Sequence, residues 1–194
     1  MAYNITLTGK NKKEALELLE LSAKILNTSK LTYWLDGGTL LGIVRENRLL
    51  PWDDDVDISM INPGEKALQN LIKKLKKANK RVKVRYFENN CEYFSKNNIR
   101  LIKVRNKSLF GLLKGKVCLE IFVRYKKDYN TYCKIGEQVQ VIPYSLCDSY
   151  KTLTFKDYDY CVPKFTSEYL TLKYGDWKTP VKDWCVFKND KSMS

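Results

Sequence analysis

The chain has 194 residues, with 35 Lys and Arg against 22 Asp and Glu, so its formal net charge is +13, and it contains no histidine. The missing histidine excludes Ser-His-Asp triads, imidazole bases and histidine-based zinc sites. No apolar run approaches the ~18–20 residues of a membrane-spanning helix, and the first residues do not resemble a signal peptide. We therefore expect one globular, cytoplasmic domain over residues 1–194, without a membrane span and with its six scattered cysteines reduced.

The hydrophobic pattern predicts helices that alternate with strands. Apolar side chains recur about every 3.6 residues from Lys13 to Leu26, which is typical of an amphipathic helix. The other predicted elements, in chain order, are a strand at 32–35, a helix at 39–46, a strand at 56–60, a helix that opens at 62–64, strands at 81–87, 99–104 and 117–123, and a helix at 165–174. This order predicts an α+β fold in which helices flank a mixed sheet.

Residues 66–85 form a basic segment without a single acidic residue. Its lysines lie off the apolar stripe of the predicted helix, so a solvated face is the expected role, and binding of an anionic polymer is the alternative. Aromatic residues are not interleaved with these cations, so we do not expect sequence-specific recognition of nucleic acid.

Four of the five residues from 53 to 57 are acidic. On an extended strand Asp53, Asp55 and Asp57 project to one side, whereas Asp54 falls on the apolar side, and we expect Asp54 at the start of the strand, exposed or behind the metal ligands. Like charges this close raise one another's pKa unless a cation lies among them. Asp55 and Asp57, about 6–7 Å apart along a strand, can hold one hard cation, and a set of oxygen ligands favours Mg²⁺ or Mn²⁺. The alternative is an acidic surface turn that balances the lysines.

A pair of glycines precedes these acids, between a predicted strand and a predicted helix. Glycines let backbone N–H groups approach an anion closely, and a helix N-terminus favours phosphate. We therefore expect Gly37, Gly38 and Thr39 to hold phosphate oxygens beside the metal, although a glycine pair also makes ordinary turns. The sequence has neither a phosphate-binding GxxxxGK[ST] loop nor a GxGxxG motif.

A third carboxylate is expected from the predicted strand at 117–123. The apolar residues at its odd-numbered positions face one way and Glu120 faces the other. A buried acid is costly unless it is paired or bound to metal, so we expect Glu120 to be the third metal ligand. Pairing of Glu120 with an Arg or Lys is the alternative, and Asp128 is the candidate if the register of the strand differs.

Three motifs resemble the LicD family, which includes bacterial phosphorylcholine transferases and fukutin-type enzymes. They are YWLDGGTLLGIVR at 33–45, LPWDDDVDI at 50–58, and YLTLKYGDWKTP at 169–180, which is similar to the family's closing Tyr-Gly-x-x-Trp motif. The resemblance extends from about residue 14 to residue 184. It implies a nucleotidyltransferase-type fold and transfer of a phosphorylated alcohol from a CDP-activated donor to a hydroxyl of a sugar, glycan or polyol.

The resemblance also assigns roles residue by residue. It implies that Asp55 and Asp57 are metal ligands, and it places Glu120 where the family more usually has Asp. Glu46 occupies a position that is often His in the family, so a donor contact by that imidazole is not expected here.

The expected reaction moves phosphocholine or a polyol phosphate and releases CMP. Arg45 and Arg48 are candidates for contacting the departing CMP, although Arg45 is equally a candidate partner for Asp36. Without histidine, Glu120 or Asp53 is the available base for the acceptor hydroxyl.

Two tryptophans and two predicted loops are the remaining candidates for contacting or selecting the substrates. Trp34 or Trp52 is a candidate to stack on the cytosine, and a place in the core is the alternative for both. Residues 106–116 and 128–150 are interpreted as loops that set specificity. Two other functions remain open: transfer of the nucleotide itself to a protein, RNA or small molecule, and non-catalytic binding of an anionic polymer through residues 66–85.

Overall fold

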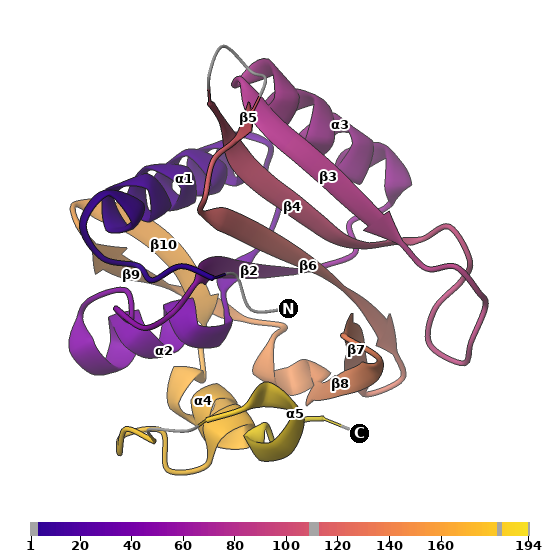
Figure 1. Ribbon diagram of the computed structural model, residues 1–194. Coiled ribbons are helices and arrows are strands. Elements are labelled where there is room, and N and C mark those ends of the chain that lie inside the picture. Colours follow the sequence, from indigo (N-terminus) through magenta and orange to yellow (C-terminus); the bar gives the residue numbers. More distant parts are fainter. Residues whose placement is uncertain (1–3, 109–112, 182–183, 194) are drawn as a thin grey trace.

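The computed structural model describes residues 4–108, 113–181 and 184–193, and its centre is a mixed β-sheet. The main strand order is β1-β2-β6-β4-β3 (Figure 1). Strands β2 (Asp55–Ile61) and β6 (Cys118–Lys127) pair in parallel, and the other neighbours on this path are antiparallel. These other strands are β1 (Trp34–Leu35), β4 (Ile99–Ser108) and β3 (Lys80–Tyr86). The mixed sheet with flanking helices confirms the predicted fold class.

Helices α1 (Gly9–Thr28) and α3 (Glu65–Lys77) lie along one face of this sheet (Figure 1). In α3 the buried side chains recur at intervals of three or four residues, so a single stripe faces the sheet while the lysines remain exposed. The strands contribute every second residue to the same core, among them Val56, Ile58, Leu119 and Ile121, which are fully buried. Both helices were predicted from this periodicity.

Shorter strands and helices complete the fold. Helix α2 (Gly37–Glu46) follows β1 and packs against β2. The remaining elements are β5 (Leu113–Lys114), β7 (Asn130–Ile135), β8 (Gln138–Pro143), the 3₁₀ turn η2 (Tyr144–Leu146), β9 (Tyr150–Phe155), β10 (Tyr158–Pro163), α4 (Thr166–Tyr174) and α5 (Val186–Asn189). Strands β9 and β10 form a separate two-stranded sheet.

The interpretation of residues 128–150 as a loop is wrong, because most of this segment is the β7–β8 hairpin. These strands alternate polar and apolar residues over only six positions each, and a single glycine, Gly136 at φ +60°, marks their turn. The β9–β10 hairpin turns at Lys156 and Asp157, which both adopt positive φ without the usual Asn-Gly signal. Part of the other predicted loop, 109–112, lies outside the described residues.

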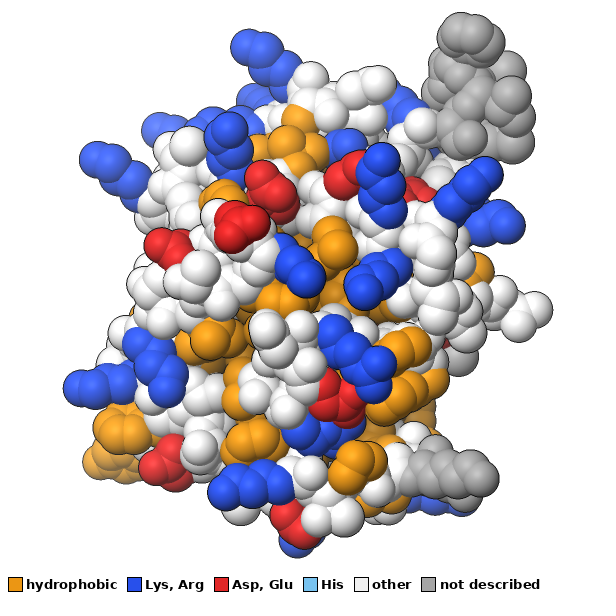
Figure 2. All heavy atoms as spheres, turned by 90° about the vertical axis from the view of Figure 1, so that its left-hand side faces the viewer, with side chains coloured by type: hydrophobic (Ala, Val, Ile, Leu, Met, Phe, Trp, Pro, Cys, Tyr) orange, Lys and Arg blue, Asp and Glu red, His pale blue; other side chains and the backbone are white. Residues whose placement is uncertain are grey.

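Lys and Arg side chains stand out over much of the face that carries α1 and α2, with hydrophobic side chains between them (Figure 2). Three of the cysteines, Cys118, Cys133 and Cys147, are buried as small hydrophobic residues, whereas Cys91 is exposed. Among the described residues, every helix is too short or too polar to cross a membrane.

Candidate active site

Asp36, which follows β1 and is the N-cap of α2, and the first three residues of that helix, Gly37 to Thr39, form what we call the glycine turn. Asp36 caps α2 by accepting a hydrogen bond from the Gly37 N–H at 2.7 Å. Its own N–H donates to the Asp57 carbonyl at 3.1 Å, and the Asp57 N–H donates to the Thr39 hydroxyl at 2.9 Å. The glycine turn is therefore fastened to β2 at Asp57.

Both glycines of this turn are required by the acids beside them. A Cβ atom at Gly37 would collide with the Asp57 carboxylate, and one at Gly38 would collide with the Asp53 carboxylate. Gly37 also adopts φ +55°, a conformation that glycine reaches without strain. The glycines thus make room for carboxylates. Thr39 is 2% exposed and supports β2, so its predicted phosphate contact remains a prediction.

The acids precede and enter β2. Oxygen atoms of Asp53, Asp54 and Asp55 all lie within 4.8 Å of one another. Asp54 lies at the start of β2 as expected, but the expectation that it faces the apolar side is wrong, because the chain turns before β2 and the Asp53 N–H bonds to the Leu50 carbonyl at 3.1 Å. Strand alternation therefore begins only at Asp55, and Asp54 joins its neighbours.

Glu120, on β6, lies next to Asp57 and so borders the group of acids at the start of β2. The parallel register sets Glu120 opposite Asp57, and the antiparallel register sets Lys103 of β4 on its other side. The Lys103 ammonium lies 2.6 Å from Glu120 Oε1. The structure thus shows the alternative, pairing of Glu120 with a lysine, and the expected role of Glu120 as a metal ligand remains a prediction. Asp128, the other candidate, lies in an exposed turn with φ +52°.

Together Asp53, Asp54, Asp55, Asp57 and Glu120 form what we call the acid cluster. Burial raises the pKa of Asp55 and Asp57 above the usual range of a carboxyl, and repulsion from neighbouring carboxylates raises it further. Burial likewise raises the pKa of Asp53 to about 6. Carboxylates held together against their own repulsion are the arrangement that a hard divalent cation relieves.

The acid cluster lines a cleft of about 1040 Å³. Its other walls are the glycine turn, the β3–β4 connection, the β7–β8 turn and the segment that follows α4. Trp52 lines this cleft and is 59% exposed. Trp34 is fully buried and donates to the Tyr169 hydroxyl at 3.1 Å, so its proposed stacking on cytosine is wrong.

The two candidate arginines differ in position. Arg45 lines the cleft, and its guanidinium lies 2.6 Å from Glu46 and 3.4 Å from the Trp177 carbonyl. Arg48 pairs with the other oxygen of Glu46, also at 2.6 Å, and is absent from the described lining of the cleft. The alternative that Arg45 is the partner of Asp36 is wrong, because Lys173 holds that place.

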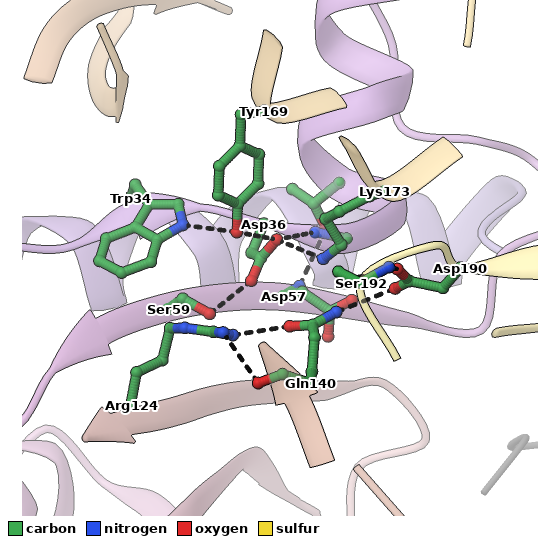
Figure 3. A network of polar contacts seen from close by, with 12 residues as sticks. Trp34, Asp36, Asp57, Ser59, Arg124, Gln140, Tyr169, Lys173, Asp190 and Ser192 are labelled. Atoms are coloured by element: carbon green, nitrogen blue, oxygen red, sulfur yellow. Dashed lines mark hydrogen bonds and ion pairs between the residues drawn. The ribbon is translucent and has the colours of Figure 1, made fainter. Parts of the chain in front are cut away.

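A buried polar network behind the glycine turn was missed by the sequence analysis (Figure 3). Lys173 of α4 lies 2.7 Å from Asp36 Oδ1, and the Tyr169 hydroxyl donates to the same oxygen at 2.9 Å. Ser59 of β2 donates to Oδ2 at 2.5 Å. The available signal was a lysine and a tyrosine one helical turn apart, just before Gly175, within the third motif.

Comparison with known proteins places this site in a family. The family model described as LicD/FKTN/FKRP, nucleotidyltransferase domain, matches residues 30–165. A protein named ribitol-5-phosphate transferase FKTN from Macaca fascicularis is 31% identical over 183 residues, which cover 89% of this chain and 35% of that protein. Its human counterpart is 30% identical over the same shares. The chain therefore spans about a third of the length of these curated relatives.

Two further proteins are similar over different extents. A protein named lipopolysaccharide cholinephosphotransferase LicD from Haemophilus influenzae is 40% identical over 45 residues, covering 23% of this chain and 17% of that protein. Among solved structures, ANT(2")-Ia in complex with adenylyl-2"-tobramycin gives a TM-score of 0.42 at 14% identity, covering 77% of this chain and 68% of the other, a likeness too loose to carry an argument. On the match to the family model and the length of the FKTN alignments, this chain belongs to the LicD/FKTN/FKRP family.

Proposed function

We propose that this chain transfers a phosphorylated alcohol, phosphocholine or a polyol phosphate, from a CDP-activated donor to a hydroxyl of a sugar, glycan or polyol, releasing CMP. The observation that carries the proposal is the acid cluster, which lines a large cleft beside the glycine turn. Relatives named as transferases of ribitol 5-phosphate and of phosphocholine support this class of reaction.

The same residues support a divalent cation. Their donor atoms are all carboxylate oxygens, they are crowded and partly buried, and the pKa values of three of them are raised. We propose that Asp55, Asp57 and Glu120 hold Mg²⁺ or Mn²⁺, with Asp53 and Asp54 adjoining. When bound, the ion supplies positive charge that neutralises the phosphates of the donor.

The residues around the acid cluster bind and orient the donor. The N–H of Gly37 is taken by Asp36, so Gly38 offers the first backbone N–H of the glycine turn to a phosphate oxygen. Arg45 lines the cleft and is aligned by Glu46, from where it contacts the departing CMP. Trp52 presents an exposed ring at the cleft on which the cytosine stacks.

The acceptor hydroxyl needs a base, and Asp53 is the proposed one. Its carboxylate lies against Gly38 and lines the cleft. As the acceptor oxygen forms its bond to the phosphorus of the transferred group, its proton passes to an oxygen of Asp53. The bond from that phosphorus to the oxygen of CMP breaks, and CMP leaves with the electron pair.

The products distinguish this reaction from its alternative. The protein is incubated with CDP-choline, CDP-glycerol or CDP-ribitol and a panel of sugar and polyol acceptors, and the acceptors are analysed by mass spectrometry. We expect one acceptor to gain the mass of the phosphorylated alcohol with release of one CMP. An acceptor that instead gains a nucleotide, from these donors or from ATP labelled at the α-phosphate, would contradict the proposal.

A further inference from the structure

Tyr174 is the last residue of α4, and its side chain lines the cleft that holds the acid cluster. Two earlier residues of this helix, Tyr169 and Lys173, are buried and bind Asp36 (Figure 3). Successive residues of an α-helix point about 100° apart around its axis, so Tyr174 leaves α4 on a different face from these two. The buried network therefore anchors the helix from which Tyr174 reaches the cleft.

The Tyr174 side chain is held in place by its ring and leaves its hydroxyl unused. The ring packs against that of Trp184, which also lines the cleft, with 4.8 Å between the ring centroids and 44° between the planes. The Tyr169 hydroxyl is bonded to both Asp36 and Trp34. The Tyr174 hydroxyl, by contrast, forms no hydrogen bond with any residue that the structure describes. A phenolic hydroxyl has one proton to donate, so a fixed and unused donor stands at the cleft.

This donor lies among carboxylates. Burial raises the pKa of Tyr174 well above its usual range, and four nearby carboxylates raise it further, those of Asp36, Asp57, Asp190 and Asp53. Two of these carboxylates, Asp53 and Asp57, belong to the acid cluster. The hydroxyl therefore keeps its proton at neutral pH and lies close to the acid cluster without bonding to it.

A neutral donor suits this position better than a cation. The lysines beside the acids pair with them: Lys103 lies 2.6 Å from Glu120, and Lys173 lies 2.7 Å from Asp36. An ammonium group at position 174 would pair with the acid cluster in the same way and would compete with a divalent cation. A hydroxyl leaves the carboxylates charged, yet it still donates a strong hydrogen bond to an anionic oxygen. Tyr174 can thus contact a phosphate without displacing a metal.

We propose that the Tyr174 hydroxyl donates a hydrogen bond to a non-bridging oxygen of the phosphoryl group that is transferred, which makes Tyr174 a further catalytic residue. This inference rests on the proposed function. Negative charge spreads over the non-bridging oxygens during phosphoryl transfer, and a donor already fixed by α4 and Trp184 stabilises that charge without rearranging. Tyr174 keeps its proton throughout, because the proton of the acceptor hydroxyl passes to Asp53. No bond of Tyr174 forms or breaks, and CMP leaves with the electron pair of its bond to phosphorus.

Turnover of Tyr174→Phe tests the contact, because this change removes the hydroxyl and keeps the ring that packs on Trp184. The control is Tyr129→Phe, which removes a hydroxyl from a side chain that is 89% exposed in the β6–β7 turn. We expect kcat for CMP release to fall about 10-fold to 100-fold in Tyr174→Phe, with the donor KM changed less than threefold and the melting temperature unchanged. Tyr129→Phe should keep the wild-type kcat. A wild-type kcat in Tyr174→Phe, or an equal fall in both variants, would overturn the inference.

Vanadate tests the same contact without turnover, since it adopts the trigonal-bipyramidal geometry of a phosphoryl group in transfer and transition-state analogues bind more tightly than substrates. Its binding to the full chain is measured by calorimetry in the presence of CMP and Mg²⁺. We expect the dissociation constant of vanadate to rise at least tenfold in Tyr174→Phe, and that of CMP alone to change less than twofold in the same variant.

The two measurements separate this inference from the proposed function. Equal affinity for vanadate in the wild type and Tyr174→Phe, together with CMP release by the wild type, would refute the role of Tyr174 while the proposed function stands. Weaker vanadate binding in Tyr174→Phe, with no CMP release by the wild type from any donor and acceptor, would refute the proposed function and leave the contact between Tyr174 and a phosphoryl group.

Discussion

Lys173 and Asp36 form a buried ion pair, with 2.7 Å between their charged atoms and each side chain 5% exposed. Burial alone would raise the pKa of Asp36, but the attraction of Lys173 and Arg124, together with hydrogen bonds, holds that pKa well below its usual range. Because Asp36 also caps α2, this pair fixes the start of the glycine turn.

Substitution of Lys173 by Met should strand the Asp36 carboxylate in the interior. We expect it to lower the free energy of unfolding by about 3–5 kcal/mol, measured by urea denaturation at pH 7. The double variant Lys173→Met, Asp36→Asn should recover part of this loss, because an amide needs no cation. If the losses of the two single variants simply add in the double variant, the two residues do not act as a pair.

The lowered pKa of Asp36 also predicts how stability depends on pH. The unfolded chain, where the pKa of Asp is about 3.9, binds the proton more readily than the folded protein. The contribution of Asp36 is therefore full above the unfolded pKa and is lost as the pH falls toward the folded pKa. Between about pH 5 and pH 2, the free energy of unfolding should fall more steeply in the wild type than in Asp36→Asn, as urea titrations at each pH can show; parallel curves would contradict this assignment.

Substitution of Gly38 tests whether the close packing of the glycine turn against Asp53 matters for activity. Its replacement by Ala should displace the Asp53 carboxylate and lower kcat on the order of 100-fold, without unfolding α2, since Ala favours helices. Gly9→Ala is the control, because a Cβ atom there meets nothing within 4 Å although φ is +50°. Similar losses of activity in both variants would show that the position of Asp53 is not the cause.

The helices and strands that were predicted correctly are those with a clear hydrophobic periodicity in the sequence. Helices α1 and α3 and strands β2 and β6 each carry one continuous apolar face, and the structure confirms them within a few residues. The β7–β8 hairpin was not predicted, because its strands are short and its turn residues are weak signals. Lys173 was missed for another reason: its partner Asp36 is distant in sequence, and only the packing of α4 brings the two together.

The register between neighbouring strands could not be predicted from the sequence either. Alternation correctly turned Glu120 away from the apolar face, but it could not indicate which cation lies beside it. That depends on the register between β4 and β6, which is set by packing of both strands against the helices. The division of the basic segment 66–85 into a helix and a strand was predicted, whereas the position of that helix and strand relative to the sheet depends on packing.

The C-terminal elements are tied to the sheet by a second part of the buried network (Figure 3). Arg124 of β6 donates to Gln140 of β8 at 2.6 Å, and Gln140 donates to Asp190 at 2.9 Å. Gln140→Met removes both bonds, so we expect a loss of about 1–3 kcal/mol and faster hydrogen exchange in residues 186–193, with β2 still protected. Unchanged exchange in 186–193, measured by mass spectrometry, would show that this bridge does not hold the segment.

Across the whole molecule, charge is unevenly placed. The chain carries a net charge of +13, yet five of its acids gather in the acid cluster. A basic surface attracts anionic substrates over a distance, while the acid cluster repels them unless its charge is neutralised. The proposed reaction therefore requires a cation at the acid cluster, although the protein as a whole is cationic.

Metal binding can be measured without turnover. Mg²⁺ or Mn²⁺ at millimolar concentration should raise the melting temperature of the wild type, because a ligand that binds only the folded state stabilises it. Asp55→Asn should lose this shift, and Asp128→Asn, which removes an exposed acid in a turn, should keep it. EDTA should reverse the shift. An equal shift in all three proteins would contradict a metal site at the acid cluster.

The most direct test of the proposed function is release of CMP from CDP-ribitol, CDP-glycerol and CDP-choline, measured with the panel of sugar and polyol acceptors. We predict release from one donor that depends on Mg²⁺ or Mn²⁺, falls at least 1000-fold in Asp57→Asn and persists in Asp128→Asn. Release that continues at the wild-type rate in a folded Asp57→Asn protein, or after removal of the metal by EDTA, would contradict the central claim that the acid cluster carries the reaction.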